Sequence, residues 1–161
     1  MAGEERSVEA PLRRAERGQE VTPYESPGDE HAALIVPGRP FAKQRPRMTR
    51  GGFAYTPKGT RSFEDLVRQL GAQHWPEPYD CPVFVSAAFF FEPAKSLSQK
   101  KKAALMGTPH IGRPDLDNLV KAILDGLNRV AFTDDKLVAQ VWACKRYSAT
   151  QESRITVRPC P

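Results

Sequence analysis

Apolar residues recur along this chain at two spacings, which predict where its helices and strands lie. Between residues 62 and 75 they follow the i, i+3, i+4, i+7 spacing of an amphipathic helix, with Ser62 and Asp65 resembling a capping box. The same helical spacing runs from Leu116 to Leu127. A short basic segment, residues 96–107, predicts a third helix that ends at its glycine.

The remaining apolar runs predict strands. Residues 33–36 form a short run that a Pro-Gly pair ends, and residues 81–93, rich in Val and Phe and bounded by Pro, predict a central strand. Residues 137–147 and 153–159 predict two more strands, expected to be antiparallel neighbours because their connection is short. Prolines and paired glycines in residues 42–61 predict a long loop or an irregular hairpin. This order predicts a single small α/β domain with a mixed β-sheet packed with helices.

The first 30 residues differ from the rest in composition. They are rich in Glu, Arg, Pro and Gly and poor in large apolar side chains, so they bury too little surface to offset the chain entropy lost on folding. We therefore expect residues 1–30 to be a disordered or loosely attached charged arm, and residues 31–161 to form the folded domain.

The folded domain is strongly basic outside one acidic region. The whole chain carries a net charge of +5, yet its first 30 residues hold eight acids against four arginines. Five of the other 11 acids fall between residues 115 and 135, and the rest of the domain holds 18 Lys and Arg against six acids. A basic surface around one acidic patch suits a polyanion held through its phosphates.

Cysteine content and hydropathy indicate the cellular compartment that is expected for this protein and its relation to membranes. Three scattered cysteines, without a disulfide framework or a CxxC pair, are typical of a reducing compartment. No apolar run reaches the roughly 18 residues of a membrane span, and the first residues lack an apolar signal core. We therefore expect a cytoplasmic protein with no membrane partner.

The acidic region begins with the stretch RPDLDNLVK. On the predicted helix, Asp117, Lys121 and Asp125 share with Asn118 the side opposite the apolar stripe. An ordinary ion-pair ladder on a solvated face could explain that ridge by itself. The ion-pair ladder does not explain Asp115, because this residue lies close to Asp117 with no base between them. Two neighbouring carboxylates repel each other unless a cation or water screens them.

A second acidic doublet, Asp134 and Asp135, follows the helix after a short loop and precedes a predicted strand. Oxygen ligands clustered in this way suit hard divalent cations such as Mg²⁺. Such a cation polarises a phosphoryl oxygen, and Lys121 could stabilise charge that develops on the same phosphate. An EF-hand is excluded because its third acid, its glycine and its final Glu are missing. An aspartyl-phosphate phosphatase is excluded because the segment HIGRP before the first acids is a poor strand.

The stretch GRPDLDNLVKAILDGLN followed by FTDDKLV resembles the signature of the RusA family of Holliday junction endonucleases, which are common on phage and prophage genomes. The upstream PGRPFAKQRPR also resembles the first strand and basic loop of many members, so the resemblance covers about residues 32–158. It implies that the acids binding Mg²⁺ or Mn²⁺ and carrying catalysis are Asp115, Asp117 and Asp135, with Lys121 as the catalytic lysine. Supporting roles are implied for Asn118, Asp125 and Asp134.

The resemblance also implies a homodimer whose two equivalent sites make paired nicks across a four-way DNA junction. The expected reaction is phosphodiester hydrolysis that leaves a 5′-phosphate. The expected biological role is in DNA recombination and repair. A two-fold symmetric substrate is well matched by an isologous dimer.

Basic side chains near the acids are expected to bind DNA phosphates. Lys43, Arg45 and Arg47 alternate with other residues and would face one way on an extended segment, and Arg113 lies beside the first acid. Two alternatives stay open. One is a non-catalytic basic DNA-binding protein whose acids only cap and ladder a helix, and the other is a metal nuclease with broader flap or fork specificity.

Overall fold

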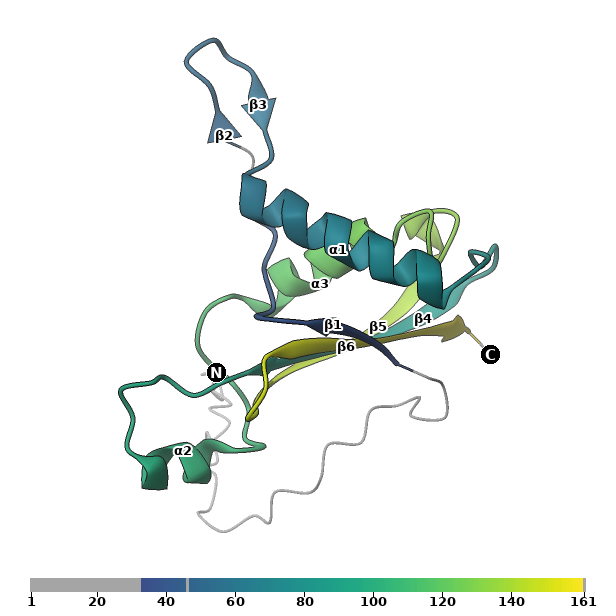
Figure 1. Cartoon of the computed structure of the whole chain (residues 1–161). Coiled ribbons are helices and arrows are strands. Elements are labelled where there is room, and N and C mark those ends of the chain that lie inside the picture. Colours follow the sequence, from purple (N-terminus) through teal and green to yellow (C-terminus); the bar gives the residue numbers. More distant parts are fainter. Residues whose placement is uncertain (1–32, 46, 161) are drawn as a thin grey trace, which may run out of the picture.

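A four-stranded mixed sheet, in the order β1-β6-β4-β5, forms the centre of the computed structural model, which describes residues 33–45 and 47–160. The strands are β1 (Leu34–Pro37), β4 (Val83–Phe91), β5 (Val138–Tyr147) and β6 (Glu152–Pro159). β6 runs antiparallel to β1 and to β4, whereas β5 runs parallel to β4. A separate hairpin, β2 (Arg47–Met48) and β3 (Ala54–Tyr55), projects from one end of the domain (Figure 1). The arm predicted for residues 1–30 lies outside the described residues.

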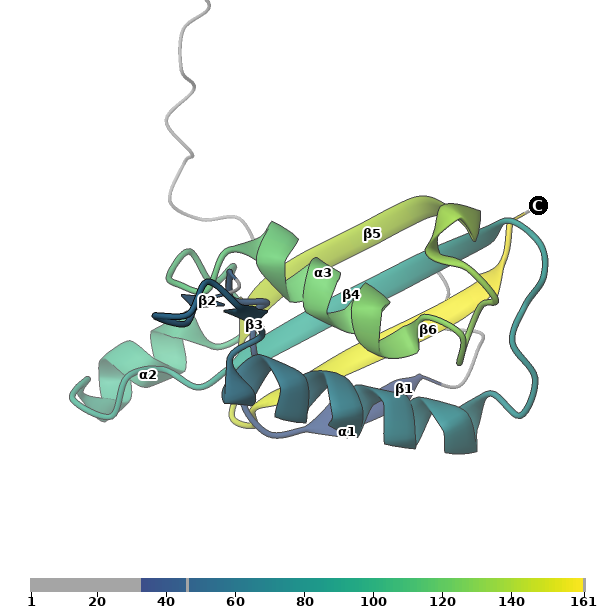
Figure 2. The ribbon, with the colours of Figure 1, turned by 90° about the horizontal axis from the view of Figure 1, so that it is seen from above.

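The core lies between one face of this sheet and two helices. α1 (Lys58–His74) and α3 (Leu116–Leu127) cross the same face (Figure 2). In the predicted apolar stripe of α3, Leu119, Ile123 and Leu127 are fully buried there, and the other members are partly buried against this core. Gly126 lets the two helices approach closely, because a Cβ at this position would lie 2.7 Å from a side-chain atom of α1. The structure therefore confirms a single small α/β domain with a mixed sheet and three helices.

β4 occupies the interior of the sheet because it is buried on both faces along its whole length. Its alternate residues face away from the helices, where the guanidinium groups of Arg154 and Arg158 lie 4.9 and 4.6 Å from the ring centroids of Phe90 and Phe84. A strand that is apolar on both faces gains most from a neighbour on each edge, and β4 pairs with β5 on one side and β6 on the other. The prediction that the last two strands are neighbours is therefore wrong, because β4 lies between them.

The first predicted helix also differs from its expected start. α1 begins at Lys58 with Pro57 as its N-cap, so the capping box predicted from Ser62 and Asp65 is wrong. Proline suits a helix start because it has no N–H to leave unpaired. Asp65 instead pairs with Arg68, at 2.9 Å between Oδ1 and Nη1.

The helix predicted from the basic segment is α2 (Gln99–Leu105), and it begins at a serine N-cap. The Ser98 hydroxyl accepts a hydrogen bond from the N–H of Lys101 at 3.4 Å. Gly107, just beyond the end of α2, has a positive φ of 74°, the left-handed conformation that glycine adopts most readily. Within the described residues, no helix combines the length and the apolar character needed to span a bilayer.

Candidate active site

The acidic stretch forms the N-terminal end of α3. Asp115 is the N-cap residue, and its side chain makes no capping hydrogen bond. Asp117 lies exposed in the first turn, where its Oδ1 accepts a hydrogen bond from the amide of Asn118 at 3.3 Å. Among the described residues, neither carboxylate is paired with a Lys or Arg. Both carboxylates are therefore free to bind a cation.

A groove of about 510 Å³ opens beside this end of α3. The segment that follows β1, residues 39–44, forms one wall, and residues 113–115 together with Asn118 form the other. The two walls are joined by a hydrogen bond of 2.9 Å from the N–H of Lys43 to the carbonyl of Asn118. Charged or polar side chains of both segments line the groove: Arg39, Lys43, Gln44, Arg113, Asp115 and Asn118. Cations that can hold a phosphate thus stand beside carboxylates that can hold a metal ion.

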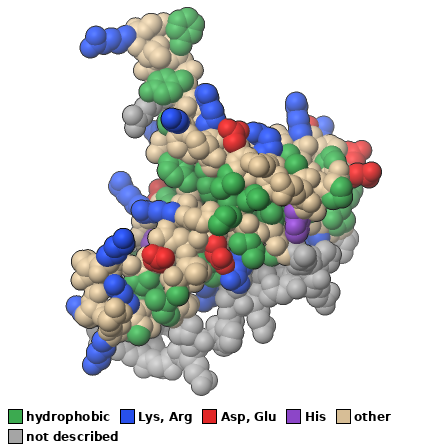
Figure 3. Space-filling view, in the orientation of Figure 1, with side chains coloured by type: hydrophobic (Ala, Val, Ile, Leu, Met, Phe, Trp, Pro, Cys, Tyr) green, Lys and Arg blue, Asp and Glu red, His purple; other side chains and the backbone are tan. Residues whose placement is uncertain are grey.

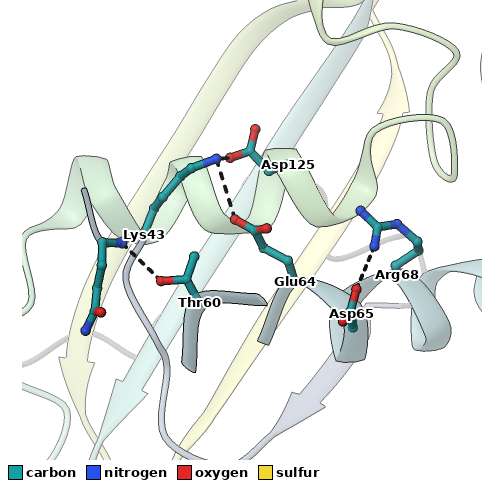
Figure 4. A network of polar contacts seen from close by, with 7 residues as sticks. Lys43, Thr60, Glu64, Asp65, Arg68 and Asp125 are labelled. Carbon is teal, nitrogen blue, oxygen red and sulfur yellow. Dashed lines mark hydrogen bonds and ion pairs between the residues drawn. The ribbon is translucent and has the colours of Figure 1, made fainter. Parts of the chain in front are cut away.

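Lys43 fastens the groove wall to both helices. Its Nζ pairs with the carboxylate of Asp125 on α3 and lies 3.5 Å from Oε1 of Glu64 on α1 (Figure 4). Partial burial acts to lower the pKa of Lys43, but these two carboxylates outweigh it and raise the pKa. Lys121 is exposed and pairs with neither Asp117 nor Asp125 in the described structure, so the ion-pair ladder considered for this ridge is not formed. The DNA contact predicted for Lys43 stays a prediction beside this structural role.

Lys145, which was not among the site residues predicted from the sequence, holds the backbone that leads into α3. Lys145 on β5 donates from Nζ to the carbonyls of Gly112 and Pro114, both at 2.7 Å. These bonds hold the chain immediately before Asp115. Because the acceptors lie 33 and 31 residues away in the sequence, no local pattern could have indicated the contact.

The second acidic doublet forms a short 3₁₀ turn, η1 (Asp135–Leu137), directly before β5. Asp134 caps this turn, and its Oδ1 accepts a hydrogen bond from the N–H of Lys136 at 3.0 Å. That bond, together with the charge of Lys136, lowers the pKa of Asp134. Asp135 is exposed as the first residue of the turn. The cap therefore orients the chain so that the second carboxylate faces solvent.

The two acidic regions lie at opposite ends of the sheet (Figure 2). Seven residue steps along β5 separate Val138, which follows η1, from Lys145, which holds the segment before Asp115. At about 3.3 Å per residue, that separation is roughly 23 Å. A metal ligand must lie about 2.1 Å from Mg²⁺, so one chain does not bring Asp135 to Asp115 and Asp117. Consistent with this, no three His, Cys, Asp or Glu side chains in the described part of the chain are grouped to hold a metal ion.

The predicted DNA-binding residues divide between the groove and the hairpin. Arg113 is exposed and lines the groove, and Arg45 is exposed where the chain leaves the groove wall. Arg47 belongs to β2. Arg39, which was not among the predicted DNA-binding residues, lines the groove as well, and its place two residues after the first strand was the signal that could have indicated it.

A basic α/β domain with carboxylates beside a cationic groove is the kind of protein that acts on nucleic acid. Residues 37–158 match the family described as Endodeoxyribonuclease RusA, so the chain belongs to this family, and membership implies endodeoxyribonuclease activity. The chain is also similar to "Uncharacterized protein YqaN" of Bacillus subtilis (strain 168), with 30% identity over 133 residues that cover 78% of this chain and 94% of that protein. The family resemblance found in the sequence is thereby confirmed.

Proposed function

We propose that this protein is a divalent-metal-dependent endodeoxyribonuclease that resolves Holliday junctions and other branched DNA by paired phosphodiester nicks. The observation that carries the proposal is the pair of carboxylates at the start of α3, Asp115 and Asp117, which form no ion pair among the described residues. Asp115 lines the cationic groove, and Asp117 lies in the first turn of the helix beside it. Membership of the endodeoxyribonuclease family supports the class of reaction. The choice of branched DNA rests on the resemblance to Holliday junction endonucleases.

The residues present fit a hard divalent cation. Within the described part of the chain, the side chains of Asp115 and Asp117 make no capping hydrogen bond and no ion pair, and carboxylate oxygens are what Mg²⁺ or Mn²⁺ prefers. The cation, when bound, polarises a phosphoryl oxygen and makes hydroxide available near neutral pH. Asn118 orients Asp117 through its amide, and Arg113 holds the scissile phosphate from the groove wall. Lys121 stabilises the charge that develops as the bond breaks to leave a 5′-phosphate.

A homodimer supplies the third carboxylate. β5 is an edge strand of ten residues, with Ala139, Gln140 and Val141 exposed, and a long exposed edge is a ready surface for pairing with another chain. Antiparallel pairing of two β5 edges places the start of one strand beside the end of the other. Asp135 of the partner subunit then lies at the end of the sheet that carries Asp115. The resulting dimer has two equivalent sites, as paired nicks require.

The proposal is tested by incubating the protein with synthetic four-way junction, flap, fork and linear duplex DNA in Mg²⁺, Mn²⁺ or EDTA. We expect paired nicks in the junction with either metal, none in EDTA, and loss of nicking in Asp117→Asn. A non-catalytic DNA-binding protein, which the incomplete set of acids in one chain favours, predicts tight, salt-sensitive junction binding and no nicking with any metal. Equal cleavage of flaps and forks would indicate a nuclease of broader specificity.

A further inference from the structure

The β2–β3 hairpin holds three large apolar side chains in solvent. Met48 is 68% exposed, Phe53 77% and Tyr55 43%. The hairpin projects beyond the start of α1 (Figure 1), and hydrophobic and Lys or Arg side chains gather on it in the space-filling view (Figure 3). A two-stranded hairpin of this size is marginally stable in water by itself, and clustered exposed apolar side chains mark interaction sites. The hairpin therefore has the character of a binding element.

The turn of the hairpin holds Phe53 at the tip. The N–H of Thr49 donates to the Phe53 carbonyl at 2.8 Å, and the N–H of Phe53 donates to the Thr49 hydroxyl at 3.1 Å. Gly52 has a φ of +82°, which a residue with a Cβ adopts only with strain. A Cβ on Gly51 would stand 3.6 Å from the Phe53 ring, so the ring lies against the turn. Phe53 is therefore exposed on a turn that hydrogen bonds hold in a defined shape.

The charge around the hairpin indicates the class of partner. Residues 39–61 hold seven Lys and Arg and no Asp or Glu, so the complementary partner is a polyanion. Arg50 in the turn and Lys58 at the start of α1 are both exposed. The hairpin also continues directly from residues 39–44, the groove wall beside Asp115. A nucleic acid held in the groove therefore lies next to the hairpin.

We propose that the hairpin enters the branch point of DNA bound in the groove, where Phe53 stacks on an unpaired base while Arg50 and Lys58 contact the flanking phosphates. Stacking on an aromatic ring is tolerant of base identity, and apolar side chains inserted at base steps unstack DNA. A branch point offers bases that are already easily unpaired, whereas a linear duplex must first lose its stacking. The hairpin therefore supplies preference for branched over linear DNA. This inference rests on the proposed function, because it assumes DNA in the groove.

The test is Phe53→Ala in the full chain, with binding measured in EDTA so that cleavage does not intervene. We expect affinity for a four-way junction to fall about tenfold, the size of one lost base–aromatic stack, and affinity for a linear duplex to change less than about twofold. Phe53→Trp keeps the junction affinity. Ile35→Ala is the matched control, because it removes a 51% exposed apolar side chain from β1, outside the hairpin, and we expect no change.

Permanganate oxidation of thymines at the branch point reports base unstacking directly. Wild-type protein raises their reactivity, and Phe53→Ala does not. Unchanged junction affinity and reactivity in Phe53→Ala would overturn the proposal, as would an equal loss on junction and duplex. Conversion of a dimer to monomers by Phe53→Ala, seen by sedimentation, would instead make the hairpin a subunit contact. Wild-type protein that opens junctions but nicks none in Mg²⁺ refutes the nuclease and leaves the hairpin's role intact.

Discussion

The separation of the two acidic regions gives a sharp prediction for mixed dimers. Asp117→Asn disables the carboxylates at the start of α3, and Asp135→Asn disables the one before β5. Because roughly 23 Å of β5 separates these regions within a chain, the proposed homodimer draws the carboxylates of one active site from two subunits. A mixed dimer then holds one site with both defects and one site with neither. Each variant by itself is inactive, but the mixture regains activity.

The expected recovery follows from random pairing. Half of the dimers formed from an equal mixture are mixed, and each has one of its two sites intact, so about a quarter of the wild-type sites return. The two variants are mixed, exchanged through mild denaturant and refolded, and nicking of a four-way junction is measured in Mg²⁺. A mixed dimer cuts only one strand, so the product is a nicked junction and not a resolved pair of duplexes.

Two results would refute this reasoning. If the refolded mixture is dimeric by sedimentation yet as inactive as each variant, then all three carboxylates act within one chain and the separation closes by a conformational change. If Asp135→Asn by itself nicks at the wild-type rate, Asp135 is not a ligand at all. A mixture of two Asp117→Asn preparations is the control, because it holds no intact site in either arrangement.

Three further predictions concern stability. Gly126→Ala lowers the free energy of unfolding by about 1–3 kcal/mol in urea titrations, because its Cβ would lie 2.7 Å from Val67 and the two helices must separate; no loss would contradict the close packing. Lys43→Met lowers it by about 1 kcal/mol, and less in 1 M salt, because Asp125 loses its partner; an effect that salt leaves unchanged would refute the ion pair. Burial, then the charge of a nearby lysine, lowers the pKa of His110 from its ordinary 6.5, so the unfolded chain binds a proton more readily. Stability therefore falls as the pH drops below 6.5 toward the folded-state pKa, and His110→Gln weakens that dependence in urea titrations at several pH values; an identical pH profile would refute it.

Local sequence patterns predicted the helices and strands of this fold better than they predicted which strands lie side by side. The stripe of α3 and the two-faced burial of β4 are visible in the sequence because each depends on residues close together in the chain. Strand order is not visible in the same way. The partner of β6 depends on which strand gains most from having a neighbour on each edge. The pairing of Lys43 with Asp125 likewise joins residues 82 apart, and no spacing rule reaches that far.

The sequence suggested that the acidic residues form one cluster, whereas the structure separates them within a chain. Asp115 and Asp135 are only 20 residues apart in the sequence, which suggested one cluster. The 12 residues of α3 lie between them and carry the chain about 18 Å along the sheet. Nearness in sequence was therefore misleading, because a helix converts a short interval of sequence into most of the length of the domain.

The central claim, that the carboxylates at the start of α3 hold a metal ion for phosphodiester hydrolysis, is tested most directly on one substrate. Wild type and Asp117→Asn are compared on a synthetic four-way junction in Mg²⁺, with binding measured in parallel in EDTA. We predict paired nicks with 5′-phosphate ends for wild type, and for Asp117→Asn junction binding that persists while nicking is lost. Junction cleavage by Asp117→Asn at the wild-type rate would contradict the account.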